Sequence, residues 1–328
     1  MIEIPRGLVC LLGGVMALTS SVALAQTSAA HYPARPIRII VPQSPGASTD
    51  LTARLVAQRL SDAFKQPVVV DNRPGAGTII GTELVVRAAP DGHTLMVVAS
   101  GITINPSVHK RLPYDTERDL APITQLTRFS NLLAAHPSFA GKTLQDVLTL
   151  AKAKPGTINY ASAGLASGTH MSMELLKTLT GIDLVHIPYT GGGPAVTAAI
   201  GGQVLLNIGT TVGVLPHVRS GRLRAIAVTT AVRSIAAPEI PTFAESGVPG
   251  YEHGPWNGLF APAKTPTAVI AKLHAEVARA MQLPEVRKVF TNEGVEPVAS
   301  TPAEFAVTLR AELAMWPKVV KAAGLKVE

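Results

Sequence analysis

The chain has 328 residues, of which 47% are hydrophobic and 16% charged, and its formal net charge is +7 at pH 7. This length and apolar content predict a globular protein with a large core and about two domains. The Lys and Arg residues are scattered, with no basic run and no interleaved aromatic residues, so we expect no nucleic acid partner despite the positive charge.

The N-terminal segment, residues 1–25, has the features of a secretory signal. An apolar stretch from Leu8 to Leu18 precedes Ala23-Leu-Ala25, which fits the small-x-small pattern of a cleavage site. An uncleaved membrane anchor is the alternative, although the apolar stretch is short for a span. Cleavage would remove Cys10, the only cysteine, so we expect neither disulfides nor thiolate chemistry in the exported protein. In a bacterium, export of this kind leads to the periplasm.

Strand and helix signals alternate in the first part of the chain. The expected elements are a strand at 37–41, a helix at 48–64, a strand at 68–70, a helix at 79–85 and a strand at 95–98. This β-α-β-α-β order predicts a parallel sheet, in which ligands bind at the carboxyl ends of the strands. The loops at those ends are 44–49, 75–78 and 100–103. The Pro-rich and charged region 105–119 is expected to be irregular.

The alternation resumes after a strand at 132–135. The expected elements are helices at 143–153, 167–179, 193–200 and 212–220 and strands at 158–160, 184–187, 204–208 and 223–228. A strand at 256–261 is expected to return to the first lobe, followed by helices at 266–281 and 301–323. Thr301-Pro-Ala-Glu304 predicts a capping box at the start of the last helix, and Pro317 predicts a kink within it.

Two loops between a strand and a helix contain no Lys or Arg: Val41–Asp50 and Asn159–His170. Unpaired N–H groups at a helix N-terminus, together with the helix dipole, form an anion site without basic side chains. We expect the two loops to face each other across a cleft and to hold a small carboxylate. Asp50 is a candidate base or amine ligand, but an acidic residue in the first helical turn more commonly serves the dipole, and we favour that structural role.

Catalytic and cofactor motifs are absent from the sequence. Ser167 and His170 are the best local pair for a hydrolase, but Leu165 and Thr169 occupy the glycine positions of G-x-S-x-G, so we interpret Ser167 as a helix N-cap. The nine histidines lack metal-ligand spacing, and no nucleotide-binding glycine motif follows a strand. We therefore expect no enzyme, no metal and no cofactor.

An ordered set of short motifs resembles the periplasmic solute receptors of the tripartite tricarboxylate transporter family, the Bug or TctC-like receptors. The resemblance runs from Tyr32 to about Val327. Its landmarks include Tyr32–Pro42, Pro45-Gly-Ala-Ser-Thr-Asp50, Asn72-Arg-Pro-Gly-Ala-Gly77, Pro90-Asp-Gly-His-Thr-Leu95, Asn159-Tyr-Ala-Ser-Ala-Gly164, His186-Ile-Pro-Tyr189 and Gly247-Val-Pro-Gly-Tyr251.

The resemblance implies a type II periplasmic-binding-protein fold: two α/β lobes, a ligand cleft and a hinge that the chain crosses twice. The lobes would be 32–130 with 254–328, and 131–253. The family pattern places first-lobe ligand contacts at Ser44, Gly46, Ala47, Ser48, Thr49, Thr78 and Ser100, and second-lobe contacts at Ser162, Ala163, Gly164, Ser167, Thr169, Gly209 and Thr210.

Four positions depart from the family pattern: Ala47 replaces a glycine, Thr190 a lysine, Ala198 an acidic residue and Gly209 an aspartate. An aspartate at the last position can bind the amine of an amino acid. Its absence favours a dicarboxylate, tricarboxylate or aromatic acid without an amine.

The function that the resemblance implies is a monomeric periplasmic receptor that captures a small carboxylate for the membrane subunits of a tripartite tricarboxylate transporter. Two alternatives remain. The same two lobes serve equally well as a sensor that reports its ligand to a membrane signalling protein. A secreted hydrolase would predict turnover that is lost in Ser167→Ala.

Overall fold

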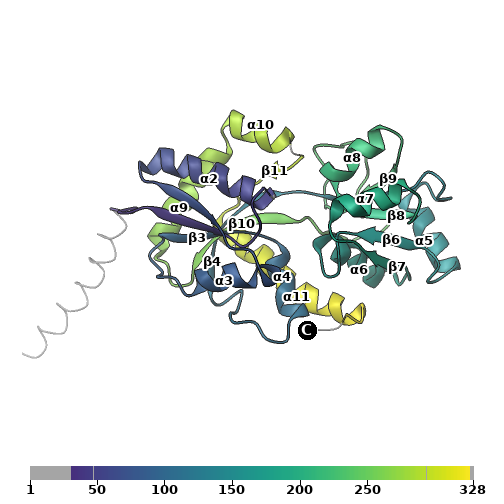
Figure 1. The fold of residues 1–328 in the computed structure, drawn as a ribbon, viewed down its shortest axis with the longest axis horizontal. Helices are drawn as coiled ribbons and strands as arrows, with labels where there is room; N and C mark the ends of the chain where they lie inside the picture. The colour runs from purple at the N-terminus through teal and green to yellow at the C-terminus, as the bar shows by residue number, and fades with distance from the viewer. Residues whose placement is uncertain (1–30, 47, 293, 326–328) are drawn as a thin grey trace, which may run out of the picture.

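The computed structural model describes residues 31–46, 48–292 and 294–325. Two α/β lobes lie side by side, and the chain crosses between them in the middle (Figure 1). The expected signal peptide at residues 1–25 and the expected ligand contact Ala47 lie outside the described residues. Within the described part of the chain, no helix combines the length and the apolar content needed to cross a membrane.

The first lobe is built on a six-stranded sheet with the strand order β11-β4-β10-β3-β1-β2. β1 pairs in parallel with both β2 and β3, as the β-α-β-α-β pattern predicts. β10 lies antiparallel between β3 and β4, which confirms that the strand predicted at 256–261 returns to this sheet. The strands are β1 Ile37–Val41, β2 Val68–Asn72, β3 Thr94–Ala99, β4 Leu120–Arg128, β10 Trp256–Pro262 and β11 Glu296–Pro297.

The helices of this lobe form because their apolar residues recur at helical spacing and face the sheet. On α2, for example, Ala53, Val56 and Leu60 are buried against β1 and β3. The helices are α2 Ser48–Phe64, α3 Ile79–Val86, α4 Gly101–Val108, α9 Thr267–Met281, α10 Pro284–Asn292 and α11 Pro302–Ala322, with the 3₁₀ turn η1 Ala76–Thr78 before α3.

The second lobe is built on a five-stranded sheet with the order β7-β6-β8-β5-β9. β6 is parallel to β7 and β8, whereas β5 is antiparallel to β8 and β9. The strands are β5 Asn131–Ala135, β6 Asn159–Ser162, β7 Val185–Pro188, β8 Leu206–Thr210 and β9 Arg224–Val228. The helices are α5 Leu144–Ala153, α6 Gly168–Thr180, α7 Gly192–Ile200 and α8 Thr211–Arg219.

The last helix, α11, contributes to the cores of both lobes. Phe305 and Leu309 pack under the first sheet, whereas Trp316 and Val320 belong to the core cluster of the second lobe. Figure 1 shows α11 reaching from the first lobe to beneath α6. The capping box at Thr301 is confirmed, and the helix continues through Pro317 to Ala322.

Three local predictions are wrong. The helix α4 covers residues 101–103, which we expected in a loop, and 105–108, which we expected to be irregular. It contains Pro106, and a hydrogen bond from Trp316 Nε1 to Thr103 Oγ1 holds it against α11. The strand predicted at 204–208 is β8 at Leu206–Thr210, so Gly209 and Thr210, expected between that strand and the next helix, are its last two residues and pair with β5. The strands β4 and β11 and the helix α10 were not expected at all.

Candidate functional site

The loop between β1 and α2 is held by Asp50 at the start of the helix. The Asp50 carboxylate is buried, and it accepts hydrogen bonds from Gly46 N–H at 2.9 Å, Asn72 Nδ2 at 3.0 Å and Arg54 Nε at 3.0 Å. Burial alone would raise the pKa of Asp50, but the bonds from Arg54, Gly46 and Asn72 outweigh it and lower this pKa. The ionised side chain therefore fixes the loop, and its interaction with the helix dipole stays a prediction.

The expected contacts of the first loop divide into exposed and buried residues. Ser44, Gly46 and Ser48 are exposed, and of these Gly46 has its N–H engaged by Asp50. Thr49 is buried and donates from Oγ1 to Asn257 Oδ1 at 2.9 Å, so its hydroxyl is engaged inside the protein. Asn257, on β10, was not predicted: it also donates from Nδ2 to the Thr127 hydroxyl at 3.1 Å, and its buried amide ties α2 to the central strands.

Thr78 and Ser100, the other expected contacts of the first lobe, also serve local structure. Thr78 has φ 83°, and its Oγ1 accepts a hydrogen bond from Asn105 Nδ2 at 3.1 Å. Asn105, a further residue that was not predicted, also donates to Gly77 O at 3.0 Å and so holds the turn before α3. Ser100 is buried at the start of α4, where its N–H donates to Trp256 O.

The second loop, between β6 and α6, is closed by its own hydroxyl groups. Ser162 is fully buried and its Oγ accepts from Gly164 N–H at 3.2 Å, while Thr169 Oγ1 accepts from Ala163 N–H at 3.1 Å. Ser167 caps α6 by accepting from His170 N–H at 3.2 Å, as predicted. The N–H groups of Ala163, Gly164 and His170 are therefore already engaged, which leaves those of Gly168 and Thr169 in the first turn of α6 for an anion.

A chain of buried and half-buried polar side chains adjoins this loop. His186, on β7, is hydrogen-bonded from Nε2 to Ser162 Oγ at 2.7 Å, and its ring stacks on that of His170 with centroids 3.8 Å apart. His170 Nδ1 accepts from the Ala166 N–H at 3.0 Å, so its proton lies on Nε2, which faces Glu174 Oε1 at 3.5 Å. Burial lowers the pKa of His186 to about 4, helped by the neighbouring His170, so this ring is neutral at pH 7.

Glu174 is the charged end of this chain. Burial would raise its pKa, but hydrogen bonds from His170, Lys177 and Tyr160 outweigh it and lower the pKa of Glu174 to about 2. The hydroxyl of Tyr160 lies 2.9 Å and the ammonium of Lys177 3.0 Å from Glu174 Oε1. Sequence reasoning missed this cluster. Its only signal was the i,i+4 spacing of His170 and Glu174 together with the His186-Ile-Pro-Tyr189 motif.

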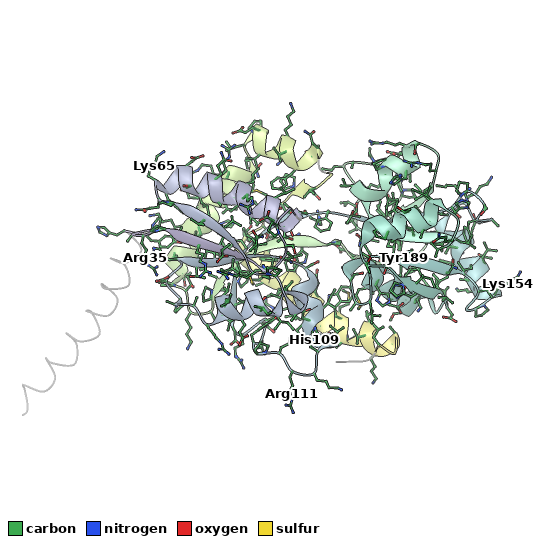
Figure 2. All side chains as sticks on the ribbon, viewed as in Figure 1. Arg35, Lys65, His109, Arg111, Lys154 and Tyr189 are labelled. Carbon is green, nitrogen blue, oxygen red and sulfur yellow. The ribbon has the colours of Figure 1, made fainter. Side chains whose placement is uncertain are left out.

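A cavity of about 650 Å³ is lined by both lobes. It brings together two of the expected contacts, Ser48 at the start of α2 and Thr210 at the end of β8. A second hollow, of about 290 Å³, is lined by Gly209 and Thr210 with residues of α7 and α8. Neither includes a residue of the loop 162–169. Tyr189, which follows β7, lies on the side of the second lobe that faces the first (Figure 2).

The described residues contain no group of three or more His, Cys, Asp or Glu side chains arranged to hold a metal ion. The pair proposed for a hydrolase also lacks catalytic geometry. The Ser167 hydroxyl donates to Gly164 O at 2.7 Å and accepts from the main chain of His170, and both ring nitrogens of His170 face other groups. The arrangement therefore offers hydroxyls and helix N-termini for binding an anion.

Comparison with known proteins decides the family. The model described as "Tripartite tricarboxylate transporter family receptor" (TctC) matches residues 52–325. The chain belongs to this receptor family. It is 37% identical over 317 residues to Protein BugT of Bordetella pertussis, covering 96% of this chain and 97% of that protein. The resemblance to Bug and TctC-like receptors is thereby confirmed.

Two solved structures of similar proteins contain carboxylates. The chain is 34% identical to R. palustris Rpa4515 with adipate, with a TM-score of 0.74, covering 89% of this chain and 98% of that one. It is 33% identical to MatC (Rpa3494) from Rhodopseudomonas palustris with bound malate, with a TM-score of 0.71, covering 88% of this chain and 100% of that one. These neighbours confirm the periplasmic-binding-protein fold, and the family is one of periplasmic solute-binding receptors.

Proposed function

We propose that this TctC-family receptor captures a small carboxylate without an amine between its two lobes and delivers it to the membrane subunits of a tripartite tricarboxylate transporter. The proposal includes export by a cleaved signal peptide at 1–25, a monomeric receptor, and lobes at 32–130 with 254–328 and at 131–253.

The observation that carries the proposal is the shared cavity. Ser48 belongs to the first sheet's lobe and Thr210 to the second, yet both line the same hollow. A ligand that contacts both residues favours the closed arrangement, because only there are both sets of contacts made. Ser48 stands at the N-terminus of a helix, where a carboxylate is favoured by unpaired N–H groups. The adipate and malate of the neighbouring structures support this ligand class.

The binding site that we propose consists of exposed and loop-shaping residues. Ser44, Gly46, Ser48 and Thr210 would contact the ligand directly, together with the N–H groups at the start of α6. The remaining expected residues would act by holding their loops in place: Ala47, Thr49, Thr78, Ser100, Ser162, Ala163, Gly164, Ser167, Thr169 and Gly209.

Titration calorimetry of the purified protein tests the ligand class with a matched pair of compounds, adipate and its uncharged diamide. We expect adipate or another acid of a dicarboxylate, tricarboxylate and aromatic acid panel to bind, and the diamide not to bind. An acid at a hundred times its dissociation constant should also stabilise the fold by about 2.7 kcal/mol in thermal unfolding. Equal binding of acid and diamide, or no binding across the panel, would overturn the proposal.

The delivery step needs a separate measurement. Uptake of the bound acid by vesicles that contain the cognate membrane subunits should depend on added receptor. If the acid binds but uptake does not depend on the receptor, the sensor role would replace transport.

A further inference from the structure

The cavity between the lobes is mainly apolar. The first lobe contributes α2, α10 and the residue Val295, and the second lobe contributes the start of α8. Its lining consists of Ser48, Leu51, Thr52, Arg54, Leu55, Gln58, Phe129, Ser130, Thr210, Val212, Gly213, Val289, Phe290 and Val295.

Large apolar side chains around this cavity remain in contact with solvent. Leu51 is 52% exposed, Val289 48% and Val212 37%, and they come from three different helices of two lobes. Single exposed apolar residues are ordinary on a protein surface, but several of them gathered around one hollow are typical of a binding site. The lobes already touch beside it, since a Cβ placed on Gly294 would lie 2.6 Å from Val212 Cγ2.

The cavity extends along one face of α2. Ser48, Leu51, Leu55 and Gln58 recur at the spacing of one helical face, so they form a stripe that begins at the helix N-terminus. From Ser48 to Leu55 the helix rises by about 10 Å. The N-terminal end carries the groups that suit a carboxylate. Beyond it, Leu51 and Leu55 form an apolar part of the wall, flanked by Thr52, Arg54 and Gln58.

One charged side chain lies beside the stripe. Arg54 lines the cavity and donates from Nε to Asp50 and from Nη2 to Asn72 Oδ1 at 3.1 Å, which engages two of the five N–H donors of its guanidinium. Ser130 is likewise engaged, with its hydroxyl 2.6 Å from Thr211 Oγ1. The polar groups that remain available are Ser48, Thr210, the amide of Gln58 and the other N–H groups of Arg54.

We propose that this cavity takes the apolar body of the captured acid, so that the ligand is a carboxylate with an aliphatic chain lying along α2. The inference rests on the proposed function, because it assumes that the carboxylate is held at the N-terminus of α2. The chain would contact Leu51 and Leu55 of the first lobe and Val212 of the second at the same time. Its burial therefore favours closure of the lobes.

Calorimetric titration with straight-chain dicarboxylates of four to ten carbons tests this inference on the purified full-length chain. Each methylene buried in the cavity should increase the affinity about fourfold until the cavity is filled. Leu51→Gln and Val212→Gln should lower the ratio of long-acid to short-acid affinity about tenfold or more. Val307→Gln, at a 60% exposed apolar position on α11 away from this cavity, is the matched control and should leave both affinities unchanged.

Each contrary outcome has its own meaning. If acids bind but the affinity does not depend on chain length, the cavity does not hold the ligand body, and the proposed function stands without this inference. If Leu51→Gln and Val212→Gln weaken short and long acids equally, the apolar walls meet each other when the lobes close, which also overturns it. If no acid of any length binds, the proposed function falls with the inference.

Discussion

Glu312 is a carboxyl group held among both tryptophans of the chain, close to where the chain passes from one lobe to the other. Its Oε1 accepts from Trp256 Nε1 at 2.8 Å, and its Oε2 lies 2.7 Å from Thr103 Oγ1. Thr103 Oγ1 also accepts from Trp316 Nε1 at 3.1 Å and lies 2.7 Å from Ser100 O. A protonated Glu312 satisfies every one of these groups, since it donates to Thr103, whose own hydroxyl is then free to donate to Ser100 O.

Burial raises the pKa of Glu312 from its ordinary value of 4.5 to about 7. Between these two values the folded protein binds the proton and the unfolded chain has released it, so stability falls as the pH rises through this window and is level above it. The whole difference corresponds to about 3 kcal/mol at 1.36 kcal/mol per pH unit. Part of the side chain lines a hollow of about 310 Å³, and water there reduces the cost, so we expect roughly 1–3 kcal/mol.

The substitution Glu312→Gln tests this reasoning, because the amide reproduces the neutral acid: its oxygen accepts from Trp256 and its NH₂ donates to Thr103. Relative to the parent protein, the variant should gain roughly 1–3 kcal/mol of unfolding free energy between pH 5 and pH 8. Urea unfolding followed by tryptophan fluorescence measures it directly, since the chain has only two tryptophans and both belong to this cluster.

Glu239→Gln, at an exposed position of the second lobe, is the control and should unfold like the parent protein at both pH values. An advantage of Glu312→Gln that is the same at pH 5 and pH 8, or that shrinks with rising pH, would refute the assignment of a neutral carboxyl at this position.

Three further predictions concern the loops and their supports. Gly46→Val and Gly164→Val should each lower carboxylate affinity at least about tenfold, while the far-UV circular dichroism spectrum stays unchanged. The reason is that both glycines have positive φ, 82° and 131°, where a valine is strained by about 1–3 kcal/mol. Affinity like that of the parent protein in both variants, measured by calorimetry, would contradict this. Asn257→Ala should cost about 2–4 kcal/mol in urea unfolding, since buried threonine hydroxyls lose their partner; a loss below about 1 kcal/mol would show that they find other partners. The pKa of His186 is about 4 in the folded protein and 6.5 ordinarily, so between these pH values the unfolded chain binds more protons than the folded one. The free energy of unfolding should therefore rise by roughly 1–3 kcal/mol from pH 4 to 6.5. His186→Asn should remove this rise, and an unchanged dependence of stability on pH in the variant would exclude His186 as its source.

The elements that sequence reasoning found are those whose signals are local. Apolar runs such as 37–41 and the helical periodicity of 48–64 determine which face is buried without reference to distant residues. The capping box at Thr301 likewise depends on four consecutive residues, since the Thr301 side chain accepts from Glu304 N–H and the Glu304 carboxylate from Thr301 N–H.

The strand β4 escaped prediction because it buries polar side chains. Thr124 and Thr127 are fully buried, and each is satisfied by a residue far along the chain: Thr124 Oγ1 donates to Ser300 O at 2.7 Å, and Thr127 Oγ1 accepts from Asn257. A polar residue in a sequence window reads as exposed unless its partner is known, and these partners become neighbours only in the folded protein.

The expected binding residues show the same limit. The sequence placed serines and threonines on the correct strand-to-helix loops, but it did not indicate which way each hydroxyl points. Thr49 turns inward to Asn257 and Ser162 inward to His186, whereas Ser48 faces the cavity between the lobes. A hydroxyl both donates and accepts, so local context alone does not distinguish a ligand contact from a loop support.

The helix α11 joins the two lobes in addition to the two chain crossings, because it packs against both. Its first half packs under the first sheet through Phe305, and its second half packs in the second lobe's core through Trp316 and Val320. Movement of the lobes must therefore either bend α11 or break one of these contacts. Pro317 follows Trp316 directly and has no N–H to donate to Leu313 O, in the turn that joins the two packed ends, so bending of that turn breaks no hydrogen bond from Pro317. The same region carries Glu312, which means that the proton bound there and the geometry of the junction depend on one set of contacts.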